Sequence, residues 1–145
     1  MNKNKGFTLI ELVVTLLVLS IVSAIAVPSL ISMFRSQNLN KSTQELRAIF
    51  TEARGKADVE RRDIEVVLNS SDQNTDTQLN WIPTGDSFLK SGSPTSVKFK
   101  LNGTIAAGSD LDFEICDYKT DPKVSKKFGI SRMGVIQSIS EGKCQ

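Results

Sequence analysis

The chain has 145 residues, of which 39% are hydrophobic and 23% are charged, and its formal net charge is +2. This size allows one modest domain beside a membrane segment, and the near balance of charge gives no global attraction to nucleic acid or anionic lipid. Any such binding would need a local patch. Because the chain has no histidine and only two cysteines, we expect no metal site, no cofactor and no enzyme activity.

The first 28 residues combine a short basic leader with an apolar run. Lys3 and Lys5 are the only charged residues of the leader, residues 1–6, and the run from Phe7 to Val27 would rise ~32 Å as an α-helix. This length matches the ~30 Å hydrocarbon core of a bilayer, so we predict a membrane-spanning helix over residues 7–28. The positive-inside tendency places the N-terminus in the cytoplasm and the chain after Pro28 outside.

Glu11 is the single charged residue inside the apolar run. A carboxylate in lipid is costly, so Glu11 is a candidate functional group that needs a cationic partner, unless it stays hydrated at the interface. An ordinary secretory signal is a further alternative, because Ala24-Ile25-Ala26 has the form of a cleavage site that would release a soluble protein starting at Val27. Glu11 would weaken such a signal, and helical periodicity continues past the site.

Residues 29–62 continue the helix as an amphipathic segment. Its apolar residues recur at spacings of three, four and seven, which predicts one buried stripe in a helix that runs from Phe7 to about Arg62. Pro28 lies inside this helix and removes one backbone hydrogen bond, so we expect a kink there. The stripe consists of Leu39, Leu46, Ile49, Phe50, Ala53 and Ala57.

Residues 63–145 change to the alternating pattern of half-buried strands. We expect an antiparallel sheet whose apolar face covers the helix stripe, which gives a two-layer α+β fold. Asn102-Gly103 predicts one tight hairpin and Met133-Gly134 a last one, while residues 69–77 and 87–96 have the composition of exposed loops. The alternating runs are residues 64–68, 79–81, 97–101, 111–115 and 128–139.

Cys116 and Cys144 are the two cysteines of the chain. Outside the cytoplasm a disulfide is the expected state, and closing this loop would stabilise a domain with a thin core by about 3 to 4 kcal/mol. A reactive thiol pair is the alternative, but the chain has no C-x-x-C spacing.

Two further groups of polar residues are weaker candidates. Asp72, Asn74 and Asp76 imitate the start of a calcium loop, but Thr77 and Pro83 stand where glycine and a bidentate glutamate are needed. Cationic residues also gather toward the end of the chain, where a solvated basic face is the ordinary interpretation and nucleic-acid binding the alternative. This basic cluster consists of Lys119, Lys123, Lys126, Lys127 and Arg132.

The segment Gly6-Phe7-Thr8-Leu9-Ile10-Glu11-Leu12 resembles the processing signature of type IV pilins and pseudopilins. The resemblance implies that a prepilin peptidase cuts after Gly6 and methylates the new N-terminal residue, Phe7. It also implies that the Glu11 carboxylate pairs with the N-terminal ammonium of the adjacent subunit and sets the register of a filament. A buried ion pair is a plausible device for such register.

The rest of the chain is similar to the FimT/FimU/GspH family of minor pilins and pseudopilins, most of all to the FimU type. Members help to initiate a type IV pilus within a minor-pilin tip complex, serve as pseudopilins of type II secretion, or bind DNA during uptake. The DNA-binding members depend on a Gly-Arg-x-Arg motif, where this chain has Gly134-Val135-Ile136-Gln137, so that Lys126, Lys127 and Arg132 would have to substitute. The similarity rests on residues 52–54, 60–64, Trp81, 113–116 and 129–134.

The resemblance also implies where the protein acts and with what. Its expected partners are other major and minor pilins, the prepilin peptidase, an inner-membrane assembly platform and, before assembly, the membrane itself, with DNA as an alternative partner. The expected location is the bacterial inner membrane, crossed once, with a periplasmic C-terminal domain, and after assembly the pilus on the cell surface.

Overall fold

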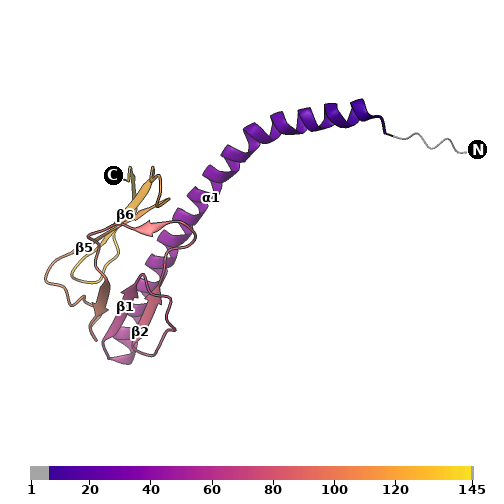
Figure 1. Ribbon diagram of the computed structural model, residues 1–145. Coiled ribbons are helices and arrows are strands. Elements are labelled where there is room, and N and C mark those ends of the chain that lie inside the picture. Colours follow the sequence, from indigo (N-terminus) through magenta and orange to yellow (C-terminus); the bar gives the residue numbers. More distant parts are fainter. Residues whose placement is uncertain (1–6, 145) are drawn as a thin grey trace, which may run out of the picture. The chain divides into compact units, whose positions relative to one another are not determined.

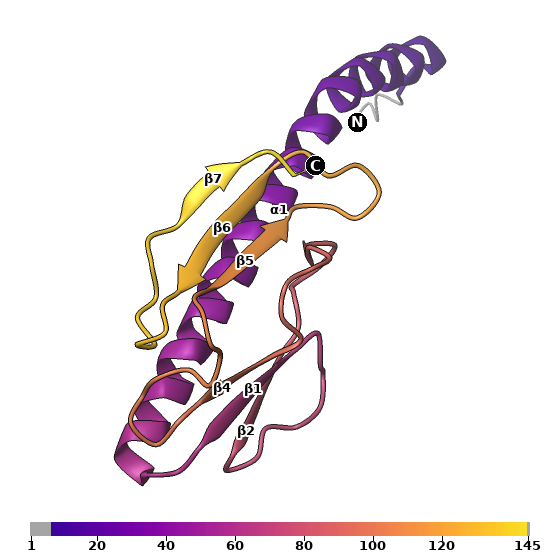
Figure 2. The same ribbon diagram turned by 90° about the vertical axis from the view of Figure 1, so that its left-hand side faces the viewer.

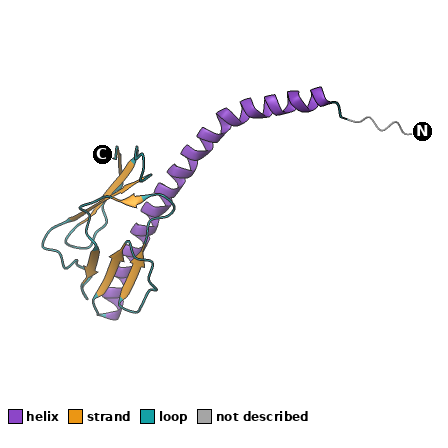
Figure 3. Ribbon diagram, viewed as in Figure 1, coloured by secondary structure: helices purple, strands orange, loops and turns teal. Residues whose placement is uncertain are grey.

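The computed structural model describes residues 7–144, which contain one helix and seven strands. Figures 1 and 3 show the long helix α1 and the strands that pack along its C-terminal part. The elements are α1 (Leu9–Glu60), β1 (Ile64–Leu68), β2 (Gln78–Trp81), β3 (Phe88–Leu89), β4 (Ser96–Phe99), β5 (Leu111–Cys116), β6 (Ser125–Ile130) and β7 (Ser140–Gly142). The chain forms two compact units, one ending at Phe34 and the other beginning at Arg35.

Helix α1 confirms the prediction of one long N-terminal helix and lies within two residues of the expected bounds. It begins after Thr8, whose hydroxyl accepts a hydrogen bond from the Glu11 amide at 3.3 Å in the manner of an N-cap. It ends at Glu60 because Arg61 adopts the left-handed conformation, with φ at 54°, that often terminates helices.

The strands of the second unit form two sheets rather than the single antiparallel sheet expected from the sequence. One sheet has the order β2-β1-β4 and the other the order β3-β5-β6-β7, which is antiparallel throughout. In the first sheet β1 pairs with β4 antiparallel but with β2 parallel. Residues 69–77 therefore carry the chain back along the sheet, which corrects the expectation of purely antiparallel pairing.

The predicted hairpins are present in shortened form. After β4, the Gly103 amide bonds the Lys100 carbonyl at 2.8 Å to close the turn, but only the bridge between Phe99 and Ile105 follows. Leu101 is thus exposed, although the alternating pattern assigned it to the buried face. The last hairpin turns over Ser131 to Val135, and its second strand is β7.

The predicted loop over residues 87–96 is wrong in part. Phe88 and Leu89 form β3, which pairs with the end of β5, and the Ser87 side chain before it is buried. The loop over residues 69–77 is exposed as expected, apart from partial burial of Ser70.

One hydrophobic core joins the helix to both sheets. The ring of Phe50, on α1, lies 6.1 Å from that of Phe99 on β4, 5.1 Å from that of Phe113 on β5 and 6.3 Å from that of Phe128 on β6. Figure 2 shows α1 behind β5 and β6, with β1 and β2 toward its C-terminal end. The predicted stripe is confirmed at five positions and half-buried at Ile49.

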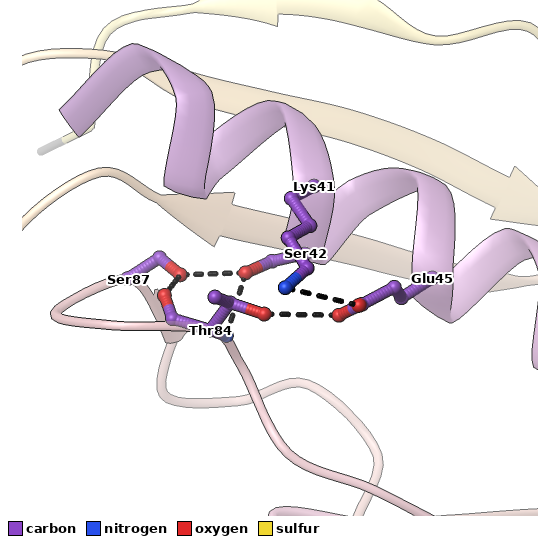
Figure 4. A network of polar contacts seen from close by, with 5 residues as sticks. All are labelled: Lys41, Ser42, Glu45, Thr84 and Ser87. Carbon is purple, nitrogen blue, oxygen red and sulfur yellow. Dashed lines mark hydrogen bonds and ion pairs between the residues drawn. The ribbon is translucent and has the colours of Figure 1, made fainter. Parts of the chain in front are cut away.

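The stripe also contains two polar residues that the apolar pattern missed, Ser42 and Thr43, both fully buried. Ser42 anchors the segment before β3 to the helix, as Figure 4 shows. Its Oγ accepts a hydrogen bond from the Thr84 amide at 2.8 Å and lies 2.7 Å from the Oγ of Ser87, which donates to the Thr84 carbonyl. Since the Ser87 proton is used there, Ser42 donates to Ser87, and every hydroxyl in this buried network is satisfied. The Thr84 hydroxyl donates to Glu45 at 2.9 Å.

Candidate functional site

The first unit exposes an apolar surface that the chain itself leaves uncovered. Every described residue from Phe7 to Phe34 is exposed, and the most apolar window of α1 has a mean hydropathy of 2.6. It is the one described helix long and apolar enough to cross a membrane. A helix that is apolar on all sides is stable only within lipid or within other protein.

Glu11 lies in the first turn of α1 and is exposed, with no ion pair to any described residue. The first turn of a helix favours a negative charge, because the unpaired amides there carry partial positive charge. Thr8 and Glu11 also have the T-x-x-E spacing of a capping box, which is a sequence signal for the start of a helix at this point. The geometry therefore leaves the Glu11 carboxylate free to receive a cation from another chain.

The predicted processing site falls at the edge of the described chain. Gly6 lies outside the described residues, whereas Phe7 is exposed and precedes the helix. A cut before Phe7 would leave Thr8 in place as the cap, so the first turn of α1 does not depend on the leader.

Pro28 lies inside α1, which is helical through this position. Proline has no amide hydrogen, so the carbonyl of Ala24 loses its ordinary helical partner. Nearby hydroxyls are satisfied within the helix: Ser20 donates to the Leu17 carbonyl at 2.7 Å and Ser32 to the Ser29 carbonyl at 2.8 Å. Such internal bonds suit a helix in an apolar environment. The kink at Pro28 stays a prediction.

Cys116 and Cys144 form the expected disulfide, with their Cα atoms 5.8 Å apart. It ties the end of β5 to the segment after β7. Glu114 lies beside it, so that three potential ligand atoms fall within 4.8 Å of one another. Both sulfurs are bonded to each other and supply no thiolate, so this cluster has no affinity for a soft metal ion.

The structure separates the three residues singled out for DNA binding. Lys126 and Lys127 are neighbours on β6, so their side chains point to opposite faces of the sheet. Lys126 pairs with Glu141 at 3.1 Å, and Lys127 pairs with Glu114 at 3.3 Å. Arg132 lies in the following turn, its amide bonded to Asp110. Two of the three cations are therefore paired with carboxylates, and these two point to opposite faces of the sheet, so the three do not form one patch.

Glu114 is the centre of a polar group on the outer face of the second sheet. Its side chain is 14% exposed and receives Lys90 at 3.0 Å as well as Lys127. Burial raises the pKa of Glu114, but the hydrogen bonds, led by that from Lys90, outweigh burial and lower the pKa below its ordinary value. The carboxylate is thus a charged anchor for two lysines and has no proton to donate near neutral pH.

Comparison with known proteins gives one motif match at the N-terminus and one similar fold. Residues 1–27 match the prokaryotic N-terminal methylation motif. The fold is similar to the crystal structure of the type IV minor pilin FimU of Pseudomonas aeruginosa, strain PAO1, with a TM-score of 0.55, 21% identity, and coverage of 77% of this chain and 99% of that chain. A search of curated proteins gives no match.

The chain therefore has a prokaryotic N-terminal methylation motif and a type IV pilin-like fold. The motif spans the predicted leader, the predicted processing site and Glu11, and the structural match establishes the pilin-like fold. Both agree with the resemblance that the sequence indicated.

Two of the three calcium-like residues, Asp72 and Asn74, have hydrogen-bond partners within the fold. Asn74 accepts a hydrogen bond from the Asn80 amide on β2 at 2.7 Å, and Asp72 accepts one from Ser70 at 2.9 Å. The Asn74 contact, together with the bond from the Thr75 amide to the Gln78 carbonyl, covers the outer edge of β2. An edge strand covered in this way is protected from pairing with another chain.

Proposed function

We propose that the protein is a minor pilin of a type IV pilus, cut by prepilin peptidase after Gly6, methylated at Phe7, and active in pilus initiation within a tip complex. The observation that carries this proposal is the exposed apolar helix with a single carboxylate, Glu11, which forms no ion pair with any described residue and lies four residues after the new N-terminus. Its partners would be other pilins, the peptidase and the inner-membrane assembly platform.

The proposed sequence of events follows from this arrangement. Before assembly, the apolar helix crosses the inner membrane once, with the second unit in the periplasm. Assembly moves the helix from lipid into a filament core, where neighbouring helices cover its apolar surface and the Glu11 carboxylate meets the methylated ammonium of an adjacent subunit. In this apolar setting an unpaired charge is costly, so the pair favours one axial register over others.

A pseudopilin of type II secretion would use the same helix and the same processing. We favour the pilus because the fold match is to a minor pilin of that machine. DNA uptake of the FimT type is less favoured, since Lys126 and Lys127 are each paired with a carboxylate.

The test is a count of surface pili by electron microscopy in a deletion strain, with and without pilus retraction. We expect pili to be lost and to return when retraction is disabled, because a priming subunit shifts the balance between extension and retraction. Normal piliation in the deletion strain would contradict the proposal, and assays of type II secretion and of DNA uptake would then separate the two alternatives.

Complementation tests the role of Glu11 in the same strain. Glu11→Ala should fail to restore pili although the protein is made and processed. Glu52→Ala is the matched control, because it removes a carboxylate from the exposed face of the same helix and breaks only a surface pair with Lys56. Full restoration by Glu11→Ala would show that the carboxylate does not set the register.

A further inference from the structure

Cationic residues surround the loop between β5 and β6 at one end of the second unit. Lys119 and Lys123 belong to this loop, Lys143 lies next to the disulfide that joins the C-terminal segment to the end of β5, and Arg35 is the first residue of the unit. Figure 2 shows the loop and the C-terminal end at the same end of the domain. We call Arg35, Tyr118, Lys119, Lys123 and Lys143 the Arg35 patch.

The fold holds this patch in place. The guanidinium of Arg35 stacks on the ring of Tyr118, with its central carbon 4.1 Å from the ring centroid. The Asp117 side chain is buried and accepts hydrogen bonds from the amides of Lys123 at 2.9 Å and Val124 at 3.2 Å, which closes the loop. The patch is therefore held in place by α1, by the closed loop between β5 and β6 and by the disulfide.

The patch keeps a net positive charge, since its four cations face two carboxylates, the buried Asp117 and the exposed Asp121. Among the described residues, Arg35, Lys119 and Lys143 form no ion pair, and Lys123 pairs only with the exposed Asp121 at 3.2 Å. By contrast, Lys126 and Lys127 on β6 are each paired with a carboxylate, Lys127 with one that Lys90 shares. The balanced charge of the whole chain therefore conceals a local cationic surface.

Chain length places Arg35 at the outer surface of a membrane. Between Glu11 and Arg35 the sequence has no charged residue, and apolar residues extend to Phe34. The 26 helical residues from Leu9 to Phe34 rise ~39 Å, close to the ~40–45 Å thickness of a bilayer with its headgroups. Arg35 is covalently next to this segment, so it meets the outer headgroups however the second unit is oriented.

We propose that the Arg35 patch binds the headgroup phosphates of anionic lipids in the outer leaflet before the subunit enters a filament. This inference rests on the membrane insertion that the proposed function includes. Guanidinium and ammonium groups are good donors to phosphate oxygens, and a tyrosine ring suits the interface between lipid and water. The contact would fix the second unit against the membrane and would be released on assembly.

The test uses the full chain in nanodiscs of phosphatidylcholine, with and without phosphatidylglycerol. Hydrogen exchange at the amides of residues 117–124 reports contact with the lipid surface. We expect exchange to be several-fold slower with phosphatidylglycerol, and the effect to vanish at high salt because the attraction is screened. The triple variant Lys119→Ala, Lys123→Ala, Lys143→Ala should lose the effect.

The matched control removes the same charge from the rest of the second unit, by Lys56→Ala, Lys98→Ala and Lys100→Ala, and should keep the effect. Equal exchange in both lipids would overturn the lipid contact and leave membrane insertion intact. Slower exchange with phosphatidylglycerol that survives in the Lys119, Lys123, Lys143 triple variant would do the same. A chain that enters neither nanodisc would overturn insertion and with it both proposals. Slower exchange caused by duplex DNA alone would assign the patch to nucleic acid and overturn the lipid proposal.

Discussion

At the scale of single residues, Ser42 shows how a polar group can hold a fold together from inside its core. Its hydroxyl satisfies the Thr84 amide and the Ser87 hydroxyl, both of which lie where water has little access. Replacing it leaves buried donors and acceptors without partners, which costs more than the loss of an exposed hydrogen bond. Ser42 is therefore the buried attachment of the segment before β3 to α1, beside the more exposed bond from Thr84 to Glu45.

We predict that Ser42→Ala lowers the free energy of unfolding by about 1 to 3 kcal/mol. Chemical unfolding of the purified chain in detergent, followed by circular dichroism, measures the change. Ser36→Ala, an exposed serine on the same helix, is the control and should stay within about 0.5 kcal/mol of the original chain. A Ser42 variant as stable as the Ser36 variant would show that the network contributes nothing to folding.

At the scale of elements, two turns that each contain a glycine bring the two sheets into contact: Gly103 lies in the turn after β4 and Gly134 in the turn after β6. Gly134 has φ at 73°, and a Cβ atom there would lie 2.2 Å from the carbonyl oxygen of Gly103 in the neighbouring turn. The Arg54 side chain of α1 packs beside both glycines. The two turns approach so closely that they have no room for a methyl group.

Gly134→Ala should therefore destabilise the domain, by about 1 to 3 kcal/mol, through backbone strain and a forced separation of the turns. The matched control is Gly108→Ala, where a Cβ atom meets nothing within 4 Å and φ lies outside the left-handed region. Thermal unfolding of both variants side by side measures the difference. Equal melting temperatures would mean that the contact between the turns is not a constraint.

The sequence predicted the buried faces of the strands but not how the strands are arranged, because an alternating pattern carries information about burial only. Alternation identifies the buried face of a strand, and it placed Val66, Val97 and Phe113 correctly. It does not encode which strand lies beside which, so the parallel pairing of β1 with β2 and the division into two sheets were not predictable. The strand β3 was missed because its two residues are too short a run to show a period, and Ser42 because polar residues are expected to face water.

The parts of the candidate site that are local in the sequence were predictable, and the parts that depend on strand register were not. The predicted leader, the apolar run and Glu11 are local signals that the sequence displays without any tertiary structure. The disulfide was expected because the positive-inside tendency predicts an extracytoplasmic location for both cysteines. The pairing of Lys126 and Lys127 with carboxylates needs strand register, which brings Glu114 opposite Lys127 and Glu141 opposite Lys126. The Arg35 patch joins residues 35 and 143, which no local pattern connects.

At the scale of the whole molecule, the two units place opposite demands on their surroundings. The first exposes its apolar side chains and requires lipid or other helices, while the second buries an apolar core of its own. Phe50 is the centre of that core, because it contacts Phe99 of the first sheet and both Phe113 and Phe128 of the second. The two sheets share few contacts apart from the helix and the glycine turns, so their cooperation depends on this ring.

We predict that Phe50→Ala destabilises the second unit by about 3 to 5 kcal/mol, the usual cost of removing a buried aromatic side chain. Because the ring touches both sheets, hydrogen exchange should accelerate together in β1 and β5. Val59→Ala is the control, since Val59 is an exposed apolar residue near the end of the same helix and should change little. If β5 alone lost protection while β1 kept its own, the sheets would be separate folding units and the core would not be shared. A joint loss instead would mean that α1, whose apolar N-terminal part needs lipid or other protein around it, also carries the folding of the whole second unit.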